Sequence, residues 1–238
     1  MLGWRGYFGY VSPSTIQFPS ELQEMLPDGV SVIAANLGVR AHQGAEFERA
    51  QEGIRNALEL VVGEGAQAVV LAGVPIAVRQ GYAGEQAANR AWSETIGVPV
   101  TSGMAASVDG LRHLGARRPV VGTAYLDEIN QQIAAYLAEA GLAPVGVRGL
   151  SVRNPAEAGR LAPTAFYRLA RDLMDAHPDA DAIFLGTRSN LQTVTIELER
   201  DLGVPVIHGT QAALWWALRQ LRVMPRPDSG RLLASSLA

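Results

Sequence analysis

Short apolar runs alternate along the chain with longer segments of helical periodicity. The apolar runs are mostly continuous, a pattern that is typical of parallel strands covered on both faces. The runs expected to form strands are Gly6–Val11, Val30–Ala35, Ala68–Leu71, Val98–Thr101, Pro119–Gly122, Pro144–Leu150, Ala182–Leu185 and Val204–Ile207.

Helical patterns lie between these runs, with apolar residues three or four positions apart. The segments expected to form helices are Ala45–Gly63, Gly84–Ile96, Met104–Leu114, Asp127–Ala140, Pro163–His177, Thr193–Leu202 and Thr210–Leu221. Gly or Pro stands at most junctions between strand and helix. The alternation predicts an α/β fold with doubly wound parallel sheets.

The chain repeats part of its own sequence. GVPVTSG, beginning at Gly97, is matched by GVPVIHG, beginning at Gly203, and AQAVVLAGVP from Ala66 is matched by ADAIFLGTRS from Ala180. FGYVSPS near the N-terminus is matched by VGTAYLD in the middle of the chain. This internal duplication predicts two similar Rossmann-like parallel-sheet domains, related by pseudo-two-fold symmetry, with the site in the cleft between them.

We expect residues 1–116 and 210–238 to form the first half and residues 117–209 to form the second. Ligands of parallel sheets bind beyond the carboxyl ends of the strands, where the amides of helix N-termini collect. The turns expected at the cleft are Ser12–Thr15, Gly73–Pro75, Thr101–Gly103, Thr123–Tyr125, Gly186–Asn190 and His208–Thr210. The tail from Pro225 has turn composition, and we expect it to be poorly ordered.

Composition restricts the chemistry. The chain has no Cys, and all 20 of its basic residues are Arg. These absences exclude thiolate nucleophiles, Cys-ligated metal sites, disulfides, lysine Schiff bases and Walker-type phosphate loops. The groups that remain for binding and catalysis are hydroxyls, carboxylates, imidazoles, guanidiniums and backbone amides.

Charge and hydropathy exclude two classes of partner. The formal net charge is −3 and the basic residues are spread along the chain, so we expect no binding to nucleic acid. The longest apolar stretch, AVVLAGVPIAV from Ala68, is too short to cross a bilayer, and the N-terminus lacks the pattern of a signal peptide. We therefore expect a cytoplasmic protein without membrane contact.

One segment carries a family resemblance. VGTAYLDEINQQIAAYLAEAGLAPVGVRGL, from Val121 to Leu150, resembles the corresponding segment of arylmalonate decarboxylases and maleate cis-trans isomerases. These enzymes belong to the aspartate/glutamate racemase superfamily, and the resemblance extends from FGYVSPS to GVPVIHGT. It implies two α/β domains with a central cleft, in which small carboxylic acids react without a cofactor through an enolate-like intermediate.

The chain departs from this family at residues that matter for catalysis. Many relatives use two cysteines, one from each half, and the resemblance puts these positions at Gly73 and Thr187. The decarboxylases are similar in having Gly at the first position, but they follow it with Thr and Ser hydroxyls where this chain has Val74 and Pro75. Without an adjacent base, a threonine hydroxyl is a poor proton shuttle.

Three residues are our candidates for catalysis. Tyr125 ends an apolar strand and could donate a hydrogen bond or a proton to an oxyanion, although a packing role is the alternative. Thr187 stands where the second family cysteine would be. His208 is the one His at an expected strand end and could act as a general acid or base, or it could be a structural histidine.

Candidates for substrate binding lie in the same turns. Arg188 and Ser189 extend an anion cradle around Thr187, although an ordinary solvated turn would have the same composition. Ser hydroxyls in the first turn could bind a carboxylate or could serve only as turn formers. The full set is Ser12, Pro13, Ser14, Asn36, Gly73, Val74, Pro75, Thr123, Arg188 and Ser189.

These residues lead to one functional hypothesis and two alternatives. We expect a cofactor-independent lyase or isomerase that binds a small carboxylic acid or related planar anion, without a metal. The first alternative is a hydrolase or other lyase that uses Thr187 and His208. The second is a homologue that binds small acids without turnover. A homo-oligomer is compatible with each hypothesis.

Overall fold

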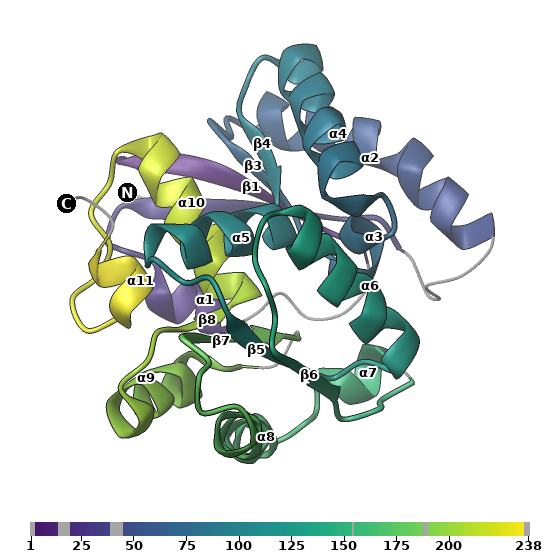
Figure 1. The fold of residues 1–238 in the computed structure, drawn as a ribbon. Helices are drawn as coiled ribbons and strands as arrows, with labels where there is room; N and C mark the ends of the chain where they lie inside the picture. Colours follow the sequence, from purple (N-terminus) through teal and green to yellow (C-terminus); the bar gives the residue numbers. More distant parts are fainter. Residues whose placement is uncertain (1–2, 14–19, 39–44, 154, 188–189, 236–238) are drawn as a thin grey trace.

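The computed structural model describes residues 3–13, 20–38, 45–153, 155–187 and 190–235, and its strands form two four-stranded sheets (Figure 1). All pairings are parallel, and the orders β2-β1-β3-β4 and β6-β5-β7-β8 are the same. The strands are β1 (Gly6–Ser12), β2 (Val30–Asn36), β3 (Val69–Leu71), β4 (Val100–Ser102), β5 (Pro119–Thr123), β6 (Gly146–Gly149), β7 (Ala182–Gly186) and β8 (Val206–His208).

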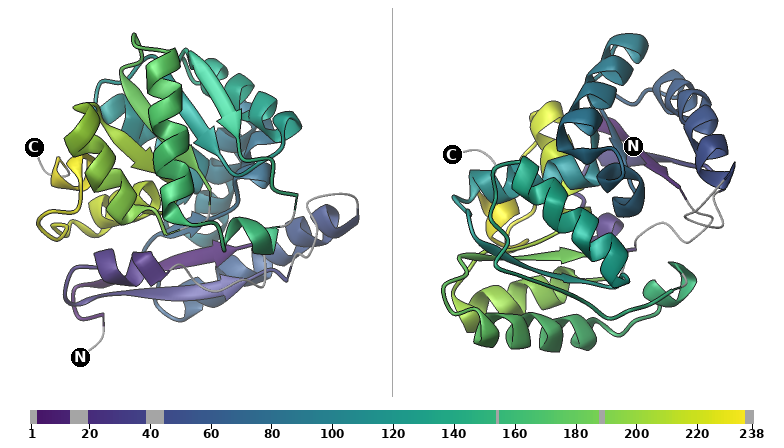
Figure 2. Two further views of the ribbon diagram at one scale, coloured as in Figure 1. Left: turned by 90° about the horizontal axis from the view of Figure 1, so that it is seen from below. Right: turned by 45° about the vertical axis from the view of Figure 1, so that its right-hand side comes forward.

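The repeated sequences occupy equivalent places in the two sheets. FGYVSPS and VGTAYLD contain most of β1 and β5, the second strand of each sheet, and the two GVPV motifs lead into β4 and β8. The duplication and the predicted α/β class with two parallel-sheet domains are therefore confirmed. Figure 2 shows the purple strands of the first sheet and the green strands of the second in separate parts of the molecule.

Helices connect the strands, as parallel pairing requires. They are α1 (Ser20–Met25), α2 (Ala45–Gly63), α3 (Val74–Val78), α4 (Gly81–Ile96), α5 (Gly103–His113), α6 (Asp127–Glu139), α7 (Pro155–Ala158), α8 (Pro163–Ala176), α9 (Gln192–Leu202), α10 (Gly209–Leu221) and α11 (Arg231–Ala234). Every expected strand and helix is present, with some ends shifted.

The unexpected helices are short. α1, α3, α7 and α11 have only 4 to 6 residues each, too few to show helical periodicity and too few to be stable without tertiary packing. α11 also corrects the expectation of a poorly ordered tail, at least up to residue 235. Leu232 and Leu233 are completely buried there, and this apolar burial anchors the segment.

α5 and α10 join the two halves. α5 follows the first sheet and α10 follows the second, and the two helices pack against each other (Figure 1). α10 also contacts β1 and β3 of the first sheet. We propose on this basis that residues 210–238 belong with residues 1–116, and that residues 117–209 form the second half.

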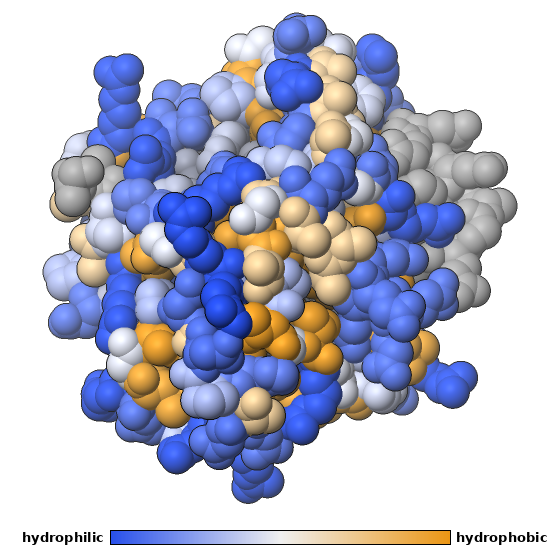
Figure 3. All heavy atoms as spheres, viewed as in Figure 1, coloured by the Kyte–Doolittle hydropathy of each residue, from blue (hydrophilic) through white to orange (hydrophobic). Residues whose placement is uncertain are grey.

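The core is continuous across the junction of the two halves. Its largest cluster includes Phe8 and Val70 from the first sheet, Val121 and Phe184 from the second, and Leu214 from α10. On the face shown in Figure 3, hydrophobic residues form small groups among hydrophilic ones. Within the described ranges, no helix combines the length and the apolar character that crossing a membrane requires.

Candidate active site

A pocket lies where the carboxyl ends of the two sheets face each other. The candidate residues that line it come from both halves: Ser12, Pro13, Gly73, Val74, Pro75, Tyr125 and Thr187. The other lining residues are Tyr10, Val70, Ala72, Gly103, Ala158, Gly209, Thr210 and Ala213. The described part of the lining is therefore mainly apolar, with a few hydroxyl groups.

Gly73 forms the turn between β3 and α3 on the first-half side. Its φ of +116° is a conformation that side chains with a Cβ rarely adopt, and a Cβ here would lie 2.9 Å from Cγ of Pro13. The following Val74 and Pro75 begin α3, and Pro suits a helix start because its missing N–H needs no partner there. This wall consequently offers backbone and apolar surface to a ligand.

Tyr125 stands on the second-half side, in the turn between β5 and α6. The buried Thr123 hydroxyl accepts a hydrogen bond from the Tyr125 amide at 3.0 Å and donates one to Oδ1 of Asn130 at 2.5 Å. A Cβ on Gly149 would lie 2.1 Å from the Tyr125 carbonyl oxygen, so β6 can approach this turn only with Gly there. Thr123 is absent from the lining and instead supports the Tyr125 backbone.

Thr187 follows β7 and is 92% buried, since its exposed fraction is 8%. Its Oγ1 has no hydrogen-bond partner among the residues that the structure describes. A buried hydroxyl without a partner costs free energy, and such groups in native proteins often have a ligand or an ordered water as their partner. Because Thr187 lines the pocket, a bound ligand is a natural partner.

Helix N-termini supply the electrostatics of the pocket. Gly73, Gly103 and Gly209 stand at the starts of α3, α5 and α10, and all three line the pocket. None of these helices has an acidic residue in its first turn. No acidic side chain of their own first turns therefore offsets their positive ends, and at α5 the Ser102 hydroxyl accepts from the Ala105 amide.

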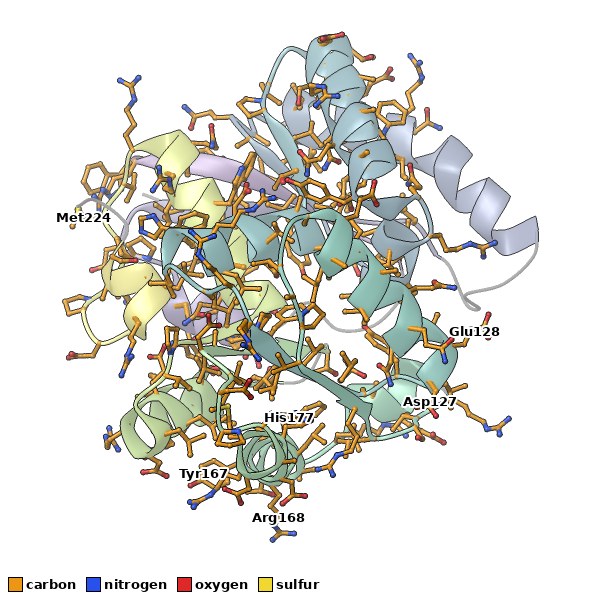
Figure 4. All side chains as sticks on the ribbon, viewed as in Figure 1. Asp127, Glu128, Tyr167, Arg168, His177 and Met224 are labelled. Carbon is orange, nitrogen blue, oxygen red and sulfur yellow. The ribbon has the colours of Figure 1, made fainter. Side chains whose placement is uncertain are left out.

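The neighbouring helices differ in this respect. α6 carries Asp127 and Glu128 in its first turn, and both side chains are exposed on its outer side (Figure 4). α9 has the Glu21 carboxylate at its start, where the amides of Leu191 and Gln192 donate to Oε2 at 2.5 and 3.1 Å. Those amides are thus already paired within the protein, so the anion cradle expected around Thr187 does not extend to them.

His208 lies outside the pocket lining, although the next two residues belong to it. Its ring is 1% exposed, with Nε2 3.2 Å from Oε1 of Gln192 and Nδ1 3.7 Å from Oε1 of Glu21. Burial lowers the pKa of His208, and the Glu21 carboxylate acts in the opposite direction. This environment suits an interior polar contact between elements.

The remaining candidates lie elsewhere. Asn36 is exposed at the end of β2, is absent from the lining and accepts a hydrogen bond from the Gly38 amide at 2.8 Å. Ser14, Arg188 and Ser189 lie outside the described residues.

Sequence reasoning missed several lining residues. Gly103, Gly209 and Thr210 lie in two of the turns that we expected at the cleft, so their signal was the repeated strand–turn–helix pattern. Tyr10 comes from the interior of β1, and Ala213 comes from the second turn of α10. No local feature of the sequence separates these two from ordinary core residues.

A smaller pocket lies behind the Gly73 turn and shares Ala72 and Gly73 with the first. Its lining includes the buried Glu85, which accepts a hydrogen bond from the Tyr136 hydroxyl and is also hydrogen-bonded to Ser102. Burial is the main cause that raises the pKa of Glu85. The described side chains form no cluster of three or more His, Asp or Glu that could hold a metal ion.

The sequence matches a known protein family along most of its length. The family model described as arylmalonate decarboxylase matches residues 9–233. The chain is 32% identical over 229 residues to the arylmalonate decarboxylase of Bordetella bronchiseptica, covering 95% of each chain. It is 30% identical over 140 residues to a maleate isomerase of Nocardia farcinica, covering 58% of this chain and 56% of the relative.

A solved structure agrees with these matches. It is a double mutant of arylmalonate decarboxylase in its liganded form, with 30% identity and a TM-score of 0.89 over 95% of this chain and 98% of that one. The family resemblance in the sequence, and the expectation of a lyase or isomerase, are confirmed by these matches. The chain belongs to the arylmalonate decarboxylase family, within the aspartate/glutamate racemase superfamily.

Proposed function

We propose that the protein decarboxylates small malonate-type acids that carry an apolar substituent, through an enolate-like intermediate and without a cofactor. The observation that carries this proposal is the Thr187 hydroxyl, which is buried and unpartnered among the described residues and lines a pocket next to three helix N-termini. The pocket also has an apolar side, formed by residues such as Val70, Ala72 and Ala213, that suits an apolar substituent.

The proposed reaction follows from charge development. When the C–C bond to one carboxylate breaks, CO₂ leaves and the electron pair is delocalised into the remaining carboxylate as an enolate. Amides at the starts of α3, α5 and α10, together with the Thr187 hydroxyl, would stabilise this charge. A proton then adds to the α-carbon. We assign it to the Tyr125 hydroxyl, which is later reprotonated from water.

The roles of the other candidates follow from their positions. Ser12, Pro13, Val74 and Pro75 would contact the substrate from the first half, whereas Thr123 would act through Tyr125. Because His208 is absent from the pocket lining, we assign it to the support of the Gly209 turn. Arg188 and Ser189 keep their predicted role as ligands of a carboxylate.

Incubation of the protein with phenylmalonate, with detection of released CO₂, tests the proposal. We expect turnover in wild-type protein and at least about a tenfold loss in Thr187→Val, which removes the hydroxyl at nearly constant volume. Binding of phenylmalonate without CO₂ release would favour the homologue that binds acids without turnover. Absence of both binding and turnover would overturn the proposal, and conversion of maleate alone would assign the protein to isomerase chemistry.

A further inference from the structure

Glu21 is a buried carboxylate that comes from the first half of the chain and binds the second half. It lies on α1, 2% exposed, and its Oε2 accepts from the backbone amides of Leu191 and Gln192 at the start of α9. These partners are 170 and 171 positions away in the sequence. A carboxylate at a helix N-terminus forms charge-assisted hydrogen bonds and interacts favourably with the helix dipole.

The neighbouring residue strengthens this contact. The Ser20 hydroxyl accepts a hydrogen bond at 2.9 Å from Nδ2 of Asn190, the residue before Leu191. Asn190, Leu191 and Gln192 are consecutive, so α1 binds three successive residues at the start of α9.

Glu21 also lies near the wall of the pocket that the start of α10 forms. Its Oε1, which has no hydrogen-bond partner among the described residues, lies 3.7 Å from Nδ1 of His208. His208 directly precedes Gly209 and Thr210, which line the pocket. The other ring nitrogen of His208 lies 3.2 Å from Oε1 of the half-buried Gln192, whose backbone amide donates to Oε2 of Glu21. Gln192 therefore links Glu21 to His208 by hydrogen bonds.

We propose that Glu21 is a positioning residue that holds the Thr187 and Gly209–Thr210 walls in register with the Gly73 wall. This inference rests on the proposed function, because it assigns a task to walls that bind the substrate there. It also explains why the substrate carboxylate should bind toward α3, α5 and α10, since Glu21 already occupies the start of α9. No signal in the sequence separates Glu21 from the other acidic residues.

Steady-state kinetics with phenylmalonate test the proposal in Glu21→Ala and Glu21→Gln. Loss of the carboxylate in Glu21→Ala should lower kcat by about tenfold to a hundredfold and change KM less, because displaced groups stabilise the transition state poorly. Glu21→Gln keeps an oxygen for the two amides and gains an amide group that can face Nδ1 of His208. We therefore expect it to recover most of the lost kcat.

Two controls separate positioning from stability. Leu22→Ala removes a buried side chain from the same helix, and Glu24→Gln changes an exposed carboxylate there. Leu22→Ala should lower the free energy of unfolding with little loss of kcat, and Glu24→Gln should change neither. Equal loss of kcat in Leu22→Ala and Glu21→Ala would overturn the proposal. If Glu21→Ala does not fold, Asn190→Ala serves in its place. It removes the exposed hydrogen bond to the Ser20 hydroxyl and should also lower kcat.

Amide hydrogen exchange keeps this test distinct from that of the proposed function. In Glu21→Ala, peptides covering residues 184–187 and 209–213 should exchange faster than in wild type, whereas Leu22→Ala should leave them less affected. Faster exchange together with no wild-type turnover would refute the proposed reaction but retain the positioning role. Unchanged exchange in both peptides would refute the positioning role whatever the turnover.

Discussion

A Cβ on Gly73 would lie 2.9 Å from Cγ of Pro13, across the wall of the pocket. Real Cβ atoms almost never approach another heavy atom so closely, and the ring of Pro13 cannot rotate away. The φ of +116° adds strain for any residue other than Gly. The position at which the resemblance predicts a cysteine in many relatives therefore favours Gly in this chain.

Gly73→Ala should lower the free energy of unfolding by about 1–3 kcal/mol, because the backbone is strained and Pro13 is displaced. Thermal or urea unfolding measures this loss. Gly209→Ala is the matched control, since Gly209 also lines the pocket but a Cβ there would meet nothing within 4 Å. Equal stability of the two variants would contradict the steric argument.

Thr187→Val should stabilise the protein by about 1 kcal/mol while it lowers turnover, because the lost hydroxyl is buried without a described partner. Urea unfolding and phenylmalonate kinetics measure the two effects. Thr195→Val is the control: its Oγ1 is likewise buried and has no partner among the described residues, but it lies outside the pocket lining. Thr195→Val should gain stability without losing turnover. A loss of turnover as large as that of Thr187→Val would contradict a specific role of the Thr187 hydroxyl.

The double variant Val74→Thr, Pro75→Ser should bind malonates more tightly. It introduces the two hydroxyls that the resemblance places after the glycine of the decarboxylases, and one added hydrogen bond to a carboxylate is worth about 1.5–3 kcal/mol. We expect KM for phenylmalonate to fall by about tenfold or more. Ala213→Ser adds a hydroxyl to another wall of the pocket and should not lower KM.

Glu85 makes the stability of the protein depend on pH. Burial raises its folded pKa above the ordinary 4.5, so its protonated form is favoured in the native state. The stabilisation that Glu85 gives the folded protein relative to the unfolded chain is complete below pH 4.5. It is lost as the pH rises through the folded pKa. Each tenfold difference in proton affinity corresponds to about 1.4 kcal/mol.

Glu85→Gln should consequently gain stability relative to wild type as the pH rises from 4.5 to 8. Urea unfolding of both proteins at several pH values measures the difference. A constant difference across this range would show that Glu85 titrates normally.

His208 should produce the opposite dependence. Burial lowers its folded pKa below the ordinary 6.5, so the neutral form is favoured in the native state. The stabilisation that neutral His208 gives the folded protein is therefore present above pH 6.5 and is lost as the pH falls through the folded pKa. His208→Asn should lack this acid-induced loss and should keep turnover within about tenfold of wild type at pH 8, since the ring does not line the pocket. Complete loss of turnover in a folded variant would instead assign His208 a direct role.

The strands and helices could be predicted from the sequence because the patterns that indicate them are local and occur twice. Continuous apolar runs such as Val120–Val121 and Ile183–Leu185 indicate strands that are buried on both faces of a sheet. The two GVPV motifs predict one strand in each half, and these strands are β4 and β8. The turns that follow these strands lead to most of the pocket lining. The family resemblance from Val121 to Leu150 added the class of enzyme.

Local patterns in the sequence predict two parallel α/β halves with Tyr125, Thr187 and Gly73 at the cleft between them, but they do not predict the order of the strands within each sheet. The packing of distant elements establishes which polar residues face the pocket and which face each other. Glu21 and Leu191 meet although 170 positions separate them, and His208 points into the interior although its neighbours line the pocket. Periodicity reports the burial of a position, whereas the partner of a buried polar group depends on how distant elements pack.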